Sequence, residues 1–296
     1  MPAEMPAHSQ GFRSEALTRA LDDAVTGDPR ALYELLARVG GLPGPRANAG
    51  VVLAFANECA ARGTKADALV ARMATIDVDV APGASKYEII PMCGVAALGA
   101  RAASDAAAMR ALATLHDCAE DLRFRVRDEV AEALARIGEA RGETLAHDLA
   151  SWMDGYFHAA AVLSALADPR WLTRIPSADV VVARLDDGFE LLKNAPSSAA
   201  RYPGFKSLLD VMTVTPVEAA ARFGVPVFDL IARWSTAKDP ALREIVSKVL
   251  AAPKLGGRFA EEVARTRGAL EATAAPRRDP RTYVGPTRGR GKKRGR

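Results

Sequence analysis

The stretch 120–138, EDLRFRVRDEVAEALARIG, decides how this chain folds. Its aliphatic residues recur every three or four positions and therefore share one face of a helix: Leu122, Val126, Val130, Leu134 and Ile137. The charged residues fall on the other faces, and Glu132 precedes Arg136 by four positions, the favourable order for a helical ion pair. The stretch therefore predicts an amphipathic helix that ends at Gly138, a residue suited to a helix C-terminus.

The same pattern covers the chain from about residue 12 to residue 272, where short apolar-periodic segments alternate with Gly, Pro, Asp or Ser. Alanine is frequent, which favours helices that pack closely. One stretch alternates like a strand, residues 75–86, but its Pro82-Gly83 pair predicts a loop. We therefore predict an all-α fold for residues 12–272, an α-solenoid of stacked antiparallel helix pairs, with a globular helical bundle as the alternative.

One spacing points to a repeat family. Asp121 is followed five and six residues later by Val126 and Arg127, and the aliphatic row continues from there. This pattern resembles the HEAT repeat family, in which such an aspartate and arginine mark the second helix of each pair. The resemblance implies that Arg127 reaches the aspartate of its own or a neighbouring repeat, forming a ladder. A partial second match is Asp239 with Arg243, and Arg243 lies 116 residues after Arg127, close to three periods of about 40 residues.

The ladder leaves two arginines of the opening stretch unassigned, Arg123 and Arg125. Helical-repeat proteins usually bind partners through charged residues on their inner face. We therefore expect these two side chains either to lie on a solvated face or to bind a partner, and they are our candidate binding residues in the helical domain.

The sequence predicts no catalytic residue, cofactor or metal site. It contains no phosphate-binding, nucleophile-elbow or HExxH motif, and its three cysteines form no CxxC pair. On a single helix, four residues would share a face and could bind a metal: His147, Ser151, Asp154 and His158. Gly155 interrupts that helix, so we predict a turn there instead.

One enzyme class provides the alternative. The alkylation-repair DNA glycosylases are built from helical repeats and use an aspartate flanked by tryptophans in a basic groove. Here Trp152 stands two residues before Asp154, and Trp171 and Trp234 lie elsewhere. Tryptophan faces could hold a cationic base. Exposed tryptophans beside Asp154 on a basic concave face would support this alternative, and buried ones would oppose it.

The net charge of +4 conceals an asymmetry. Residues 276–296 hold nine Lys/Arg and one acid, a net of +8, so residues 1–275 carry 31 basic and 35 acidic residues, a net of −4. We predict that residues 1–11 and the basic tail, 273–296, are disordered. The tail either binds RNA or DNA non-specifically, docks on an acidic protein surface or only solubilises the chain. Its candidate binding residues are Arg288, Arg290, Lys292, Lys293, Arg294 and Arg296.

The start of the chain lacks a charged-then-apolar leader, and no apolar run reaches the roughly 18 residues of a membrane span. We therefore expect a cytoplasmic protein with no membrane partner. Together these features predict a non-enzymatic helical scaffold that binds one or more protein partners on its surface, with a basic tail that tethers it to nucleic acid.

Overall fold

The computed structural model describes residues 15–104 and 109–273, and all regular structure in these ranges is helical, as predicted. The α-helices are α1 Glu15–Thr26, α2 Arg30–Val39, α3 Ala49–Arg62, α4 Asp67–Ala74, α5 Ile89–Ser104, α6 Met109–Ala119, α7 Phe124–Arg141, α8 Glu143–Asp148, α9 Tyr156–Leu166, α10 Pro169–Leu172, α11 Ala178–Lys193, α12 Pro203–Val211, α13 Thr215–Phe223, α14 Val225–Ser235, α15 Pro240–Leu250, α16 Pro253–Gly256 and α17 Ala260–Ala272. Short 3-10 helices are η1 Gly63–Ala66, η2 Lys86–Glu88, η4 Leu149–Trp152 and η5 Ser197–Arg201. None of these described helices combines the length and apolarity that crossing a membrane requires.

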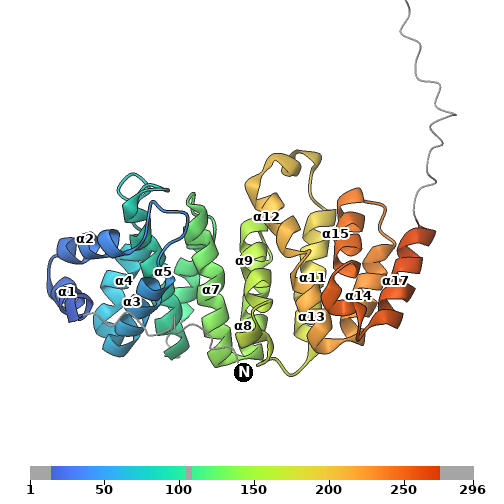
Figure 1. The fold of residues 1–296 in the computed structure, drawn as a ribbon, viewed down its shortest axis with the longest axis horizontal. Helices are drawn as coiled ribbons and strands as arrows, with labels where there is room; N and C mark the ends of the chain where they lie inside the picture. Colours follow the sequence, from blue (N-terminus) through green and yellow to red (C-terminus); the bar gives the residue numbers. More distant parts are fainter. Residues whose placement is uncertain (1–14, 105–108, 274–296) are drawn as a thin grey trace, which may run out of the picture.

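The helices stand side by side in a row that runs from α1 and α2 at one end to α17 at the other (Figure 1). Near the first end, α5 is buried along almost its whole length and packs against α3, α4 and α7. The row continues through α7 to α9, from α9 to α11 and α12, and from α11 through α14 to α17. Buried apolar side chains form one continuous core from Leu17 to Val263.

The opening stretch forms α7, but its two ends differ from the prediction. The aliphatic residues Val126, Val130, Leu134 and Ile137 are fully buried, as expected. Leu122 is not part of this row, because the helix begins only at Phe124. At the other end the helix continues past Gly138 to Arg141 and stops at Gly142, whose φ of 59° favours glycine.

Gly138 serves packing instead of helix termination. A Cβ added to Gly138 would lie 2.1 Å from Cδ2 of Trp171, so only glycine lets the indole lie against α7. One helix away, a Cβ on Gly99 of α5 would lie 2.7 Å from the Cβ of Ala133 in α7. Small residues therefore allow the close helix approach that the alanine content predicts.

Two predicted breaks are confirmed. Residues 75–86 form turns instead of a strand, until η2 begins at Lys86. The helical path also breaks before Gly155, because η4 ends at Trp152 and α9 begins at Tyr156. The predicted terminal segments, residues 1–11 and 273–296, lie outside the described residues except for Thr273.

Candidate functional site

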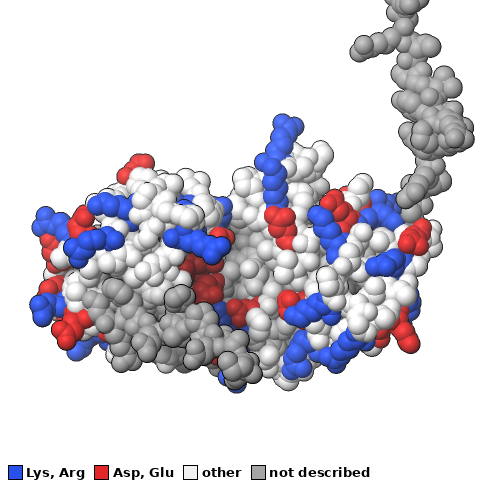
Figure 2. Space-filling model, viewed as in Figure 1, with Lys and Arg blue, Asp and Glu red and all other residues white. Residues whose placement is uncertain are grey.

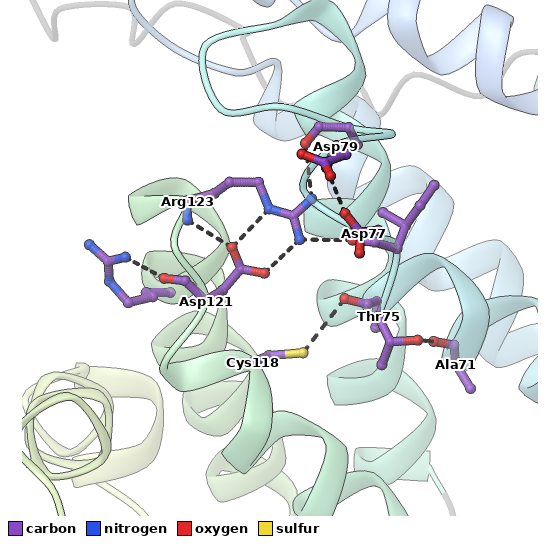
Figure 3. Close-up of polar contacts among 11 residues, drawn as sticks. Ala71, Thr75, Asp77, Asp79, Cys118, Asp121 and Arg123 are labelled. Carbon is purple, nitrogen blue, oxygen red and sulfur yellow. Dashed lines mark hydrogen bonds and ion pairs between the residues drawn. The ribbon is translucent and has the colours of Figure 1, made fainter.

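The start of α7 is built around one buried arginine, Arg123 (Figure 3). Its Nε and Nη2 donate to the two carboxylate oxygens of Asp121 at 2.8 and 2.6 Å, and its backbone N–H donates to the same carboxylate at 2.7 Å. Nη1 donates to the carbonyl of Ala81 and Nη2 to that of Ile76, each at 3.0 Å. Only 4% of the side chain is exposed. Arg123 therefore fastens both ends of the loop 76–81 to the turn that precedes α7, a set of contacts called the Arg123 clamp below.

This arrangement corrects two expectations. Arg123 was expected either on a solvated face or at a partner-binding surface, but its guanidinium group is directed inward, to Asp121 and two carbonyls. Arg127 does reach Asp121 as the ladder predicts, yet it donates to the backbone carbonyl because Arg123 occupies the carboxylate. The Arg127 guanidinium also lies 4.4 Å from the centroid of the Phe157 ring, which links α7 to α9.

Arg125, the second candidate binding residue, is also bound by groups of the protein itself. Its Nη1 lies 2.9 Å from Oε2 of Glu88, a carboxylate with no exposed surface. The same oxygen accepts a 2.8 Å hydrogen bond from the backbone N–H of Ala84, and Nη2 of Arg125 donates to the carbonyl of Gly44 at 3.4 Å. Arg125 therefore joins two loops to α7, and the expectation of a partner-binding side chain is replaced by a structural role.

The second repeat match also forms contacts other than those expected. Asp239 caps the start of α15 by accepting hydrogen bonds from the backbone N–H groups of Ala241 and Leu242. Arg243 donates to the carbonyls of Ser235, Ala237 and Leu270 and to the hydroxyl of Thr273. It thus satisfies the C-terminal ends of α14 and α17 and leaves Asp239 to its capping role.

A pocket of about 320 Å³ lies beside the Arg123 clamp, between residues 74–78 and residues 117–123. Its apolar lining includes Ile76, Val78 and Leu122, and Leu122 is 81% exposed. Its acidic lining residues are Asp77, Asp117, Glu120 and Asp121, and only Asp121 is paired with the Arg123 of the lining. Two further large apolar side chains, Val80 and Phe124, are exposed just after these two segments in the chain. The pocket, called the Leu122 pocket below, is therefore both apolar and acidic.

The sequence analysis missed this pocket because it assigned Leu122 to the buried face of the helix. The usable signal was local: Asp121 accepts a hydrogen bond from the backbone N–H of Arg123, two residues later, which forms an Asx turn. This turn places Leu122 before the helix, which begins at Phe124.

A second hollow, of about 290 Å³, lies between α3, α5, α7 and α10. Glu129 of α7 lines it. Burial, together with the neighbouring charges of Glu132 and Asp128, raises the pKa of Glu129 from an ordinary 4.5 to about 7. Glu129 is therefore a carboxyl group that the fold holds partly protonated near neutral pH.

Three side chains from separate elements meet beside the start of α9: His116 from α6, Asp154 from the turn after η4, and His158 from α9. Nδ1 of His158 lies 2.8 Å from Oδ1 of Asp154, and Nε2 of His116 lies 3.4 Å from Oδ2. The two imidazole rings stack with centroids 3.6 Å apart. Burial alone would raise the pKa of Asp154, but the hydrogen bond from His158 and the two imidazoles hold it below its ordinary 3.8.

This cluster differs from the set of residues that the sequence analysis considered as a possible metal site. His147 lies in α8 with an exposed side chain, 3.7 Å from Glu143, and takes no part. His116, 38 positions before Asp154, takes its place through the packing of α6 against α9. No local spacing could have identified it, because the contact depends on how distant helices pack.

The tryptophans do not offer a surface to a nucleobase. Trp152, Trp171 and Trp234 are all buried. The indole N–H of Trp171 donates to the carbonyl of Gly142 at 2.9 Å, and that of Trp234 to Asp186 at 2.8 Å. Figure 2 shows Lys and Arg interspersed with Asp and Glu on the face in view, with no continuous basic tract. Because the tryptophans are buried, the structure opposes the DNA glycosylase alternative.

The basic tail residues Arg288, Arg290, Lys292, Lys293, Arg294 and Arg296 lie outside the described residues. Comparison of the chain with protein-family models, with curated proteins and with solved structures found no match. The function must therefore be argued from the described residues themselves.

Proposed function

We propose that this protein is a HEAT-like α-solenoid that acts as a non-enzymatic scaffold and binds a protein partner at the Leu122 pocket. The row of helices from α1 to α17, with each helix packed mainly on its neighbours, supports the solenoid (Figure 1). The sequence spacing of Asp121 with Arg127 and of Asp239 with Arg243 is the ground for its HEAT-like character, although neither pair joins side chain to side chain.

The observation that carries the binding proposal is the 81% exposure of Leu122 at the edge of a pocket whose walls are fixed. An exposed apolar side chain at the rim of a partly apolar pocket, as Leu122 is, is typical of protein-binding surfaces. The Arg123 clamp holds both segments of the pocket wall in place before binding, which reduces the entropy lost on association.

The charge of the pocket indicates the chemistry of the partner. Asp77, Asp117 and Glu120 line it together with the neutralised Asp121–Arg123 pair. Complementary charge selects partners and accelerates association. The partner segment is therefore one that carries Lys or Arg around an apolar side chain, and that side chain packs on Leu122.

Site-specific photo-crosslinking tests this proposal. Leu122 is replaced by p-benzoylphenylalanine in the full chain, and irradiated cells are analysed by mass spectrometry. A matched control carries the same group at Val225, which is also exposed but lies on α14. We expect position 122 alone to form a crosslink, to a basic segment of one other protein, and the double substitution Asp117→Lys with Glu120→Lys to abolish it.

Two results would overturn the proposal. Equal crosslinking from positions 122 and 225 would show that Leu122 has no specific partner. Crosslinks from position 122 only to residues 276–296 would show that the pocket binds the chain's own tail.

The tail carries a second, separate proposal from the sequence, non-specific binding to RNA or DNA. Its net charge of +8 within residues 276–296 supports it. Deletion of these residues is expected to abolish salt-sensitive binding to a mixed RNA or DNA probe and to leave the thermal melt nearly unchanged. Equally tight binding by the truncated chain would contradict this proposal.

A further inference from the structure

We propose that His116, Asp154 and His158 form a binding site for a divalent transition-metal ion of the zinc type. The inference rests on the geometry of these three side chains and does not depend on partner binding at the Leu122 pocket. Two imidazoles and one carboxylate form a ligand set that binds Zn²⁺ well and leaves a fourth position open.

The distances suit such an ion. Tetrahedral ligands about 2.1 Å from zinc lie about 3.4 Å from one another. The Asp154 carboxylate lies 3.4 Å from Nε2 of His116 and 2.8 Å from Nδ1 of His158. One donor atom from each of the three residues falls within 4.8 Å of both others. Small side-chain rotations therefore bring the three donors to metal-binding distance.

The burial of one ligand and the exposure of the other two also suit a metal site. The His158 side chain is more than nine-tenths buried, and its Nε2 has no hydrogen-bond partner within the described ranges 15–104 and 109–273. Asp154 is half-exposed and His116 is partly exposed, so an ion can enter from solvent.

Space for a fourth ligand exists next to Gly155. A Cβ placed on Gly155 would lie 3.0 Å from Nδ1 of His158 and 3.8 Å from Oε1 of Glu120. The absence of a side chain at position 155 therefore leaves room beside His158. Water can occupy the fourth position, because Glu120, the first residue after α6, is not among the residues whose donor atoms lie within 4.8 Å of one another.

One feature limits the affinity. A metal on Nδ1 of His158 moves the ring proton to Nε2, for which the described residues offer no acceptor. Loss of such an outer partner weakens metal binding by about 10- to 100-fold. We therefore expect a micromolar site, weaker than a structural zinc centre with complete outer contacts.

Cys118, two positions after His116 in the chain, is not part of the cluster. Cys118 is buried, and burial raises its pKa to about 12, so it remains a protonated thiol. Cys59 is buried in the same way, with a pKa also raised to about 12.

The test is calorimetric titration of the untagged full chain with ZnCl₂, together with visible absorption of the Co²⁺-loaded protein. We expect one ion per chain and cobalt bands of a four- or five-coordinate site. His116→Ala and Asp154→Asn are each expected to weaken binding by about tenfold or more. His147→Ala is the matched control, because it removes an exposed histidine next to an acid but leaves the cluster intact.

Circular dichroism melts establish that each variant is folded, and both test substitutions change partly exposed side chains so that folding is retained. Failure of the wild-type chain to bind Zn²⁺ more tightly than millimolar would overturn the proposal. So would unchanged affinity in folded His116→Ala and Asp154→Asn, or an equal loss in His147→Ala.

Discussion

Two turns in this molecule share one local structure and differ in their surroundings. Asp28 and Arg30 open α2, and Asp121 and Arg123 open α7. In both, the arginine backbone N–H donates to the aspartate two residues before it, at 3.0 and 2.7 Å, and Nε donates to the same carboxylate. However, the Arg30 side chain is 87% exposed and that of Arg123 is 4% exposed. The local Asp-x-Arg sequence thus forms the ion pair in both turns. Burial decides whether the arginine also hydrogen-bonds other segments of the chain, as Arg123 does with Ile76 and Ala81.

A third copy stands between these extremes. Asp168 and Arg170 open α10 with the same contacts, and Arg170 also reaches Glu132 of α7 at 2.7 Å with 42% of its side chain exposed. Position 121 follows position 28 by 93 residues, and position 168 follows position 121 by 47, so the first interval is nearly twice the second.

The largest expected effect is at the buried turn. Arg123→Ala leaves the mostly buried Asp121 carboxylate unpaired and removes the hydrogen bonds to the carbonyls of Ile76 and Ala81. We expect a loss of about 3–5 kcal/mol in the free energy of unfolding, measured by denaturant titration. A loss below about 1 kcal/mol would show that burial does not distinguish this turn from the others.

The next effect concerns Glu129, a buried carboxyl group of α7. Its pKa is raised by burial and by neighbouring carboxylates, whereas the Asp121 carboxylate is paired with Arg123. The folded-state pKa of Glu129 is about 7, above the ordinary 4.5, so the folded chain binds the extra proton between these values and loses stability as pH rises through them. Glu129→Gln should therefore stabilise the chain at pH 8 by on the order of 1–2 kcal/mol and change little at pH 4. An equal change at both pH values in denaturant titrations would contradict the assignment.

A smaller effect is expected at the partly exposed turn. Arg170→Ala removes contacts to Asp168 and Glu132 that solvent already screens. We expect a loss of about 1 kcal/mol in the same denaturant titration. A loss as large as that of Arg123→Ala would mean that exposure has no bearing on the strength of these pairs.

The smallest effect is expected at the exposed turn. Arg30→Ala removes a pair that lies almost entirely in solvent, and we expect less than about 0.5 kcal/mol. The variant is also the matched control for Arg123→Ala, because both remove an arginine two residues after an aspartate at a helix start. A measured loss above about 1 kcal/mol would break the comparison.

The sequence predicted what depends on local spacing. The helical class, the buried row from Val126 to Ile137 and the break before Gly155 follow from periodicity and from turn residues, and each is confirmed. The end of α7 was placed wrongly at Gly138, because a glycine that receives the Trp171 ring looks the same in sequence as a glycine that ends a helix.

Contacts between distant segments could not be predicted. The partners of Arg123 at Ile76 and Ala81, and that of Arg125 at Glu88, lie 37 to 47 positions away. Arg127 reaches Asp121 only at its backbone carbonyl for a local reason: Arg123, two residues after Asp121, occupies the carboxylate. The Asp-x-Arg spacing was therefore visible in the sequence, but its burial was not.

The most direct test of the account is a pair of double-mutant cycles on the free energy of unfolding, one for Asp121 and Arg123 and one for Asp28 and Arg30. The cycles use Asp→Asn and Arg→Ala, singly and together. We predict a coupling energy of about 2 kcal/mol or more for the buried pair and less than about 0.5 kcal/mol for the exposed pair. Equal coupling energies in the two cycles would contradict the claim that burial turns this common turn into the clamp that positions Leu122.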